Sequence, residues 1–104
     1  MDVVNKFLAD NHNVIVRSRI VCKDGYSFSC QASAYHYCTP RSTFKPNEKE
    51  KYTMVELGFP SKDDELIHDY CEDPDHATHE IYPYVPVRIV NQLIEKHGGI
   101  VEVK

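Results

Sequence analysis

The sequence predicts a small α+β domain, in which a single-layer antiparallel sheet carries helices packed on one face. Two runs of alternating apolar and polar residues flank Lys23-Asp24-Gly25, which is a β-hairpin signal. Apolar residues spaced three or four positions apart predict a helix near each end of the chain. The 104 residues are 41% hydrophobic and 27% charged, which is typical of one globular domain. We therefore expect a single domain over residues 1–104, built from a β-hairpin plus two or three further strands.

The N-terminal part of the chain predicts a helix followed by two extended runs. Asp2 can cap the helix with its carboxylate, and the polar residues 10–13 end it. One face of this helix is apolar and is made by Val3, Val4, Phe7 and Leu8. We expect that face to lie on the core. The two extended runs cover residues 14–22 and 26–34, with the hairpin turn between them.

The register of the hairpin follows from the side-chain pattern. A two-residue turn would place Arg17 and Arg19 on the face that carries Phe28, which is unfavourable for a charged group. A three-residue turn with Gly25 in a left-handed bulge instead pairs Ile20 with Phe28 and leaves that face nearly all apolar. We therefore predict the bulged hairpin, with both arginines on the opposite, polar face.

The middle of the chain predicts a loop, a third strand and a short helix. Residues 39–51 contain two prolines and alternating Lys and Glu, which is typical of a mobile, solvated loop. Residues 52–59 alternate again and predict the third strand. Ser61 and Asp64 resemble a capping box, so they predict a short acidic helix that ends near Cys71.

The C-terminal part predicts a strand, a helix and a closing strand. Residues 80–85 are extended, and Pro83 makes them an edge strand or a bridging segment, because proline cannot donate to a β-ladder. Pro86 suits the first turn of a helix, because its missing N–H would have no partner there. Apolar residues continue at helical spacing until Gly98-Gly99, which ends the helix. Residues 100–103 then predict a short closing strand.

Composition excludes several classes of protein. The formal charge of −4 and a pI of 5.8 argue against a protein that coats duplex nucleic acid. No apolar run approaches the roughly 20 residues of a membrane span, and residues 1–4 lack the basic start of a secretion signal. We therefore expect a cytoplasmic protein with no membrane partner. In that compartment the cysteines are expected to be reduced and mostly buried: Cys22, Cys30, Cys38 and Cys71.

Two groups of residues raise the question of catalysis or metal binding. His36 and Cys38 would lie on one strand face about 7 Å apart at the backbone, which is long for a direct hydrogen bond, so we assign no catalytic residue. Potential zinc ligands cluster within twelve residues but match no standard zinc motif: His68, Cys71, His76 and His79. A polar surface loop explains them more simply, and we assign no metal. No glycine-rich phosphate loop is present, so we expect no cofactor, and an enzyme is the less favoured class.

The polar face of the hairpin is the preferred candidate site. Guanidinium groups pair phosphate oxygens, hydroxyl groups add neutral donors, and tyrosine rings can stack on a base. The predicted ligand-binding residues are Arg17, Arg19, Gln31, Ser33, Tyr35, Tyr37 and Arg41. The competing interpretation is an ordinary solvated sheet face, on which the arginines pair with Glu56 or Glu102.

Five segments carry a resemblance to other proteins: Gln31-Ala32-Ser33, residues 36–41, 55–61 and 82–86, and Lys96-His97-Gly98-Gly99-Ile100. Together they resemble small uncharacterised proteins encoded by phages and mobile elements of gut Firmicutes. Small phage proteins of this size include counter-defence factors, among them ligand sponges that sequester cyclic nucleotide or ADP-ribose signals, usually as homo-oligomers.

The resemblance implies a function by analogy. We expect a binding protein, acting in the host cytoplasm if viral, that captures a small anionic nucleotide-like ligand on the polar face and forms a homo-oligomer. One alternative is a protein–protein inhibitor of a host enzyme, which docks through an exposed sheet edge or through its acidic helix (Asp63, Asp64 and Glu65). A second alternative is a zinc-dependent hydrolase that uses the cluster between His68 and His79.

Overall fold

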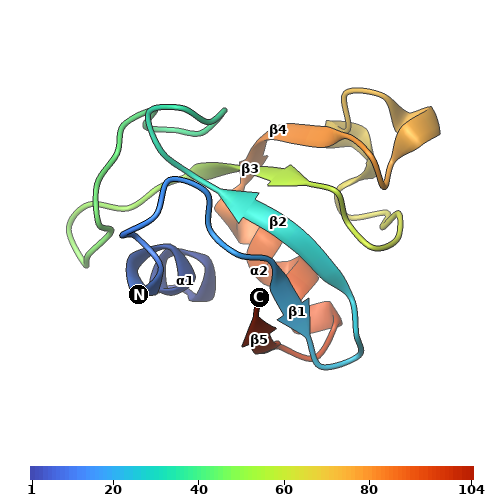
Figure 1. Ribbon diagram of the computed structural model, residues 1–104, viewed down its shortest axis with the longest axis horizontal. Coiled ribbons are helices and arrows are strands. Elements are labelled where there is room, and N and C mark those ends of the chain that lie inside the picture. Colours follow the sequence, from blue (N-terminus) through green and yellow to red (C-terminus); the bar gives the residue numbers. More distant parts are fainter.

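A computed structural model describes all 104 residues and confirms the α+β fold. Five antiparallel strands form one open sheet in the order β4-β3-β2-β1-β5 (Figure 1). The strands are β1 (Ile20–Cys22), β2 (Ser27–Gln31), β3 (Met54–Gly58), β4 (Ile81–Pro86) and β5 (Ile100–Val103). The α-helices are α1 (Val3–Asp10) and α2 (Val87–Lys96), and the short 3₁₀ helices are η1 (His68–Tyr70) and η2 (Pro74–His76). None of the helices is long and apolar enough to cross a membrane.

Both predicted α-helices form, and their ends obey the expected local chemistry. The carboxylate of Asp2 accepts a hydrogen bond from the backbone N–H of Asn5 at 2.9 Å, which caps α1. Pro86 immediately precedes α2. Gly98 and Gly99 follow the helix with φ angles of 94° and 90°, a left-handed backbone that favours glycine. These predictions are confirmed.

The hairpin adopts the predicted register but is shorter than expected. Ile20 pairs with Phe28, and Gly25 has a φ of 93°. The prediction that strand pairing starts at Val14 is wrong, because β1 begins at Ile20. Before that point the Gln31 side-chain amide accepts from the backbone N–H of Arg17 and donates to its carbonyl, both at 2.8 Å. A side chain therefore takes the place of the β-ladder there.

The remaining strands lie where the alternation predicted them. β3 pairs with β2 and places Glu56 opposite Gln31. β4 contains Pro83 and forms one edge of the sheet, as predicted, while β5 pairs with β1 at the other edge. Residues 39–51 form no helix or strand, except that Thr39 bridges to β3.

The predicted acidic helix after Ser61 does not form, and that prediction is wrong. The hydroxyl of Ser61 accepts a hydrogen bond from the backbone N–H of Ser27 at 3.0 Å, so it caps nothing. The carboxylate of Asp64 accepts from the backbone N–H of Leu66 at 3.0 Å, but it is also bound by the distant Lys96 and His97. Only the 3₁₀ turn η1 follows. Both members of the apparent capping box are thus engaged by tertiary contacts.

The core lies between the helices and one face of the sheet. Ile20, Phe28 and Leu57 on the strands are fully buried with Val90 and Leu93 of α2. In Figure 1, α2 lies behind the sheet. The opposite face of β2 and β3 carries half-buried polar side chains: Ser27, Ser29 and Glu56. All four cysteines are free and buried, as predicted.

Candidate functional site

The chain after β2 folds into a loop that is held by its own side chains. The hydroxyl of Ser33 accepts from the backbone N–H of Tyr35 at 3.0 Å, which forms a tight turn. The backbone of Ala34 donates to the hydroxyl of Thr43 at 2.9 Å and accepts from Arg41 Nε at 3.3 Å. The start of the loop from Ser33 to Thr43 is therefore cross-linked to its far end by hydrogen bonds.

A cavity of about 200 Å³ lies between this loop and the segment 12–17. Its polar lining consists of His12, Asn13, Arg17, Ser33, Tyr35 and Thr43. Its apolar lining consists of Val14, Ile15 and Ala32. Three residues of the predicted ligand site, Arg17, Ser33 and Tyr35, thus meet around one cavity.

Arg17 is the one arginine or lysine on the cavity wall, and it is only 5% exposed. Its Nε and Nη2 donate to the carbonyl of Leu8 at 3.3 and 3.0 Å, and Nη1 donates to the carbonyl of Ala32 at 2.9 Å. Leu8 belongs to the last turn of α1, where carbonyls lack helical partners. Arg17 therefore caps the C-terminus of α1 and ties it to the end of β2.

The charge of Arg17 is only partly compensated by the protein. No carboxylate forms an ion pair with Arg17, and none lines the cavity. Burial lowers the pKa of the Arg17 guanidinium, but arginine remains charged in proteins. The C-terminal end of a helix carries about half a negative charge, so roughly half of the buried positive charge is unmatched. Such a charge favours an anion in the adjacent cavity.

Two predicted ligand residues have structural roles instead. Gln31 is buried and binds both backbone groups of Arg17 and the hydroxyl of Ser29. Arg19 is half-buried, and its Nη2 donates to Ser27 Oγ at 3.0 Å and to the carbonyl of Phe59 at 2.7 Å. The prediction that Arg17 and Arg19 share one exposed sheet face is wrong, because the guanidinium of Arg17 turns into the interior and binds the carbonyls of Leu8 and Ala32.

Tyr37 and Arg41 lie on the surface outside the cavity. The guanidinium carbon of Arg41 lies 5.1 Å from the centre of the Tyr37 ring, which is a cation–π contact. The ring of Tyr37 also lies 5.9 Å from that of Tyr84, centre to centre. These two predicted residues therefore form a separate aromatic cluster.

His36 and Cys38 do not form a nucleophile and base pair. His36 Nδ1 lies 2.7 Å from Ser33 Oγ, and burial lowers the pKa of its imidazole. Cys38 Sγ donates to the carbonyls of Ser33 and Pro40, and burial raises the pKa of this thiol. A protonated, buried thiol is a poor nucleophile.

The potential zinc ligands are dispersed. No three His, Cys, Asp or Glu side chains come close enough to hold a metal ion. His68 pairs with Asp63 at 2.9 Å, and His76 pairs with Asp73 at 2.8 Å. The cluster between His68 and His79 therefore offers no preformed metal centre.

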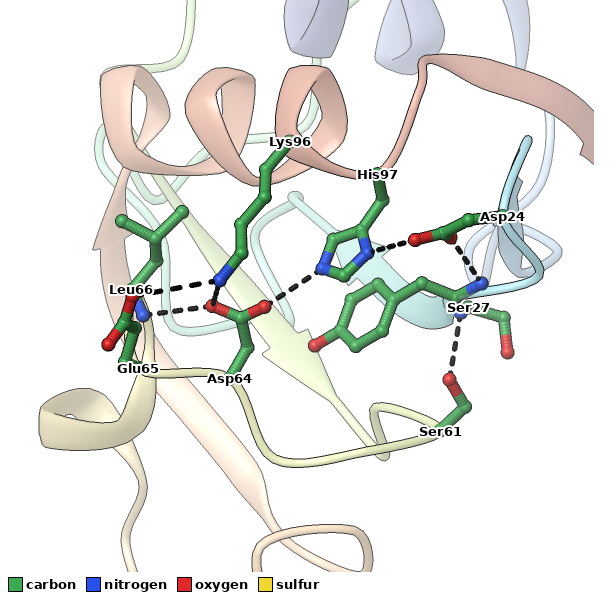
Figure 2. Close-up of polar contacts among 9 residues, drawn as sticks. Asp24, Ser27, Ser61, Asp64, Glu65, Leu66, Lys96 and His97 are labelled. Atoms are coloured by element: carbon green, nitrogen blue, oxygen red, sulfur yellow. Dashed lines mark hydrogen bonds and ion pairs between the residues drawn. The ribbon is translucent and has the colours of Figure 1, made fainter.

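A polar cluster that sequence analysis missed joins three distant segments (Figure 2). His97 at the end of α2 lies between two carboxylates: Nδ1 is 2.6 Å from Asp24 Oδ2, and Nε2 is 2.8 Å from Asp64 Oδ2. Lys96 Nζ lies 3.1 Å from Asp64 Oδ1. The ring of Tyr26 stacks on the imidazole with ring centres 3.9 Å apart. We call Asp24, Tyr26, Asp64, Lys96 and His97 the His97 cluster.

The protonation states in the His97 cluster are mutually dependent. Burial alone lowers the pKa of His97, but hydrogen bonds to Asp24 and Asp64 outweigh burial and raise this pKa above its ordinary value. Burial alone raises the pKa of Asp64, but hydrogen bonds from Leu66, His97 and Lys96 outweigh it and lower this pKa. Because the members come from residues 24–26, 64 and 96–97, no local sequence pattern predicts the cluster.

The chain matches no known protein family, no curated protein and no solved structure.

Proposed function

We propose that the protein captures a small anionic, nucleotide-like ligand in the cavity beside Arg17 and does not transform it, as a counter-defence sponge of a phage or mobile element would. The observation that carries the proposal is the buried guanidinium on the cavity wall. Three of its five N–H groups have carbonyl acceptors, so two are left without a protein acceptor. Its charge, which only a helix terminus offsets, favours an anion there.

The remaining cavity wall suits the same ligand. The hydroxyl of Thr43 accepts a bond from Ala34 and keeps its own O–H for donation. Asn13 adds an amide. Tyr35 is 73% exposed at the cavity and has a free aromatic face, and stacking on an aromatic ring is a common way to hold a nucleotide base. Donors, charge and aromatic surface are thus present together.

Calorimetry and thermal melting with a panel of cyclic nucleotides and ADP-ribose derivatives test the proposal. A ligand at about 100 times its Kd stabilises the folded state by about 2.7 kcal/mol, which is easily measured as a rise in Tm. Tyr35→Ala should weaken binding, whereas Tyr84→Ala, at a tyrosine 43% exposed and outside the cavity, should not. Failure of every ligand to bind or to raise the Tm would count decisively against the proposal.

The alternative function, inhibition of a host enzyme by direct docking, is favoured by one surface feature. Val14, Ile15 and Val16 are 49%, 63% and 68% exposed on consecutive positions. Exposed apolar side chains in a contiguous patch are typical of protein interfaces. The acidic helix expected to dock is not formed, so this patch would be the docking surface. A tight complex captured from host lysate that is abolished by Val16→Ser, a change in the patch but outside the cavity lining, would favour inhibition over ligand capture.

Homo-oligomer formation is part of the first proposal. Light scattering coupled to size-exclusion chromatography measures it directly. A monomer at all concentrations would remove this part and leave ligand capture intact.

A further inference from the structure

The charge of the cavity limits the charge of its ligand, if the proposed function holds. Arg17 contributes one positive charge, and the carbonyls at the end of α1 offset about half of it. No lysine and no second arginine lines the cavity, and His12 Nδ1 already lies 2.8 Å from the carbonyl of Ala9. A singly charged anion therefore suits the site, whereas a second negative charge would have no cation to face.

The donors around the cavity favour a phosphate group over a flat carboxylate. Arg17 comes from the segment before β1, Thr43 from the far end of the loop, and Asn13 from the turn after α1. Arg17 and Asn13 therefore belong to the segment on one side of the cavity, and Thr43 belongs to the loop on the other side. The oxygens of a tetrahedral phosphate spread in different directions and can accept from both sides at once.

The cavity is large enough for only one end of a nucleotide. Sites that enclose a whole drug-sized molecule have volumes of about 300–1,000 Å³. The cavity of about 200 Å³ therefore holds the charged end of a nucleotide but not its base. The base must lie at the rim, where Tyr35 and Ile15 are 73% and 63% exposed. These side chains offer an aromatic face and an aliphatic surface to a planar ring.

We propose that the ligand is a singly charged phosphodiester of a nucleoside, with its phosphate inside the cavity and its base against Tyr35 and Ile15. A phosphodiester carries one negative charge at neutral pH. A phosphomonoester carries nearly two above its second pKa of about 6. The site should therefore discriminate between the two esters by charge alone.

A matched pair of ligands tests the charge: adenosine 5′-monophosphate and its methyl ester, which differ by one methyl group. At pH 8 the methyl ester should bind about tenfold more tightly, a difference of about 1.4 kcal/mol. At pH 5 the two ligands carry nearly the same charge, and the difference should vanish. Equal or tighter binding of the monophosphate at pH 8 overturns the proposal while leaving anion capture, and hence the proposed function, in place.

A second comparison tests the position of the base. Dimethyl phosphate, which has the charge but no base, should bind at least tenfold more weakly than the methyl ester of adenosine monophosphate. Tyr35→Ala should reduce the affinity for the nucleoside ester about tenfold without changing that for dimethyl phosphate, and Tyr84→Ala should change neither. A loss of both affinities in Tyr35→Ala, with an unchanged Tm, overturns the placement of the base. If none of these ligands binds the wild-type protein but a cyclic nucleotide or an ADP-ribose derivative does, this proposal fails and the proposed function stands; if no ligand of either set binds, the proposed function fails as well.

Discussion

Replacing His97 by Gln should destabilise the protein by an amount that depends on pH. The imidazole is 14% exposed and binds the carboxylate of Asp64, which is 5% exposed. A hydrogen bond to a charged, buried group contributes about 1.5–3 kcal/mol, and stacking on Tyr26 adds about 0.5–1 kcal/mol. The side chain of Asp24 is 51% exposed, so its hydrogen bond to His97 adds little to the stability. The variant should therefore lose about 2–4 kcal/mol near pH 6, which lowers the Tm by about 10 °C or more.

The sign of the pH dependence follows from the direction of the pKa shift. The pKa of His97 is raised in the folded state above its ordinary value of 6.5. The contribution of protonated His97 is therefore complete below pH 6.5 and is lost as the pH rises through the folded pKa. The pKa of Asp64 is lowered from 3.8, so its contribution is lost only as the pH falls through that lower value. The cluster should stabilise the fold most between these limits.

Urea unfolding of the wild type and the variant at pH 5.5, 7 and 9 measures the effect. The difference in unfolding free energy should be largest at pH 5.5 and should shrink at pH 9 as the wild type loses its imidazolium. His76→Gln is the matched control, because His76 pairs with Asp73 at the surface with its side chain 65% exposed. This control should lose less than about 1 kcal/mol. A His97→Gln deficit that is independent of pH, or no larger than that of His76→Gln, would refute the reasoning.

The other predictions concern the backbone, the interior and the thiols. Gly98→Ala should destabilise the protein more than Gly99→Ala in urea unfolding. Both residues have left-handed φ angles, which cost about 1–2 kcal/mol for a residue with a Cβ. Only at Gly98 would the new Cβ also lie 2.9 Å from a side-chain atom of Lys23. Asn5→Leu should cost about 2–4 kcal/mol by the same assay, because Asn5 is 1% exposed and binds both backbone groups of Tyr52. An aromatic disulfide reagent at pH 8 should label the four thiols slowly in the folded protein and rapidly in urea. All four thiols are buried, and burial raises the pKa of Cys30 to about 12. Rapid labelling of the native protein would contradict the core packing.

Local patterns predicted the elements whose cause is local. Asp2 caps α1 through an atom three residues away, and the Gly25 turn sets the hairpin register through its own φ angle. Alternation located β3, and Pro83 marked β4 as an edge strand. In each case the deciding interaction lies within a few residues, so it can be read along the chain.

The predicted helix after Ser61 failed for the opposite reason. Ser61 and Asp64 have the spacing of a capping box, yet Ser61 binds Ser27, and Asp64 binds Lys96 and His97 in addition to the nearby backbone of Leu66. A cap contributes about 1 kcal/mol, which several tertiary hydrogen bonds easily outweigh. The same competition ended the first strand early, where the Gln31 side chain replaced the ladder at Arg17.

The candidate site shows the same division between local and tertiary information. Periodicity and turn chemistry are properties of neighbouring residues, so they were enough to predict the fold class, the apolar face and the residue types of the site. The position of Arg17, which caps α1 beside a cavity, and the meeting of Asp24, Asp64 and His97 emerge only in the folded chain. Such contacts join residues far apart in the chain, and their energies depend on burial, which exists only once the chain has folded.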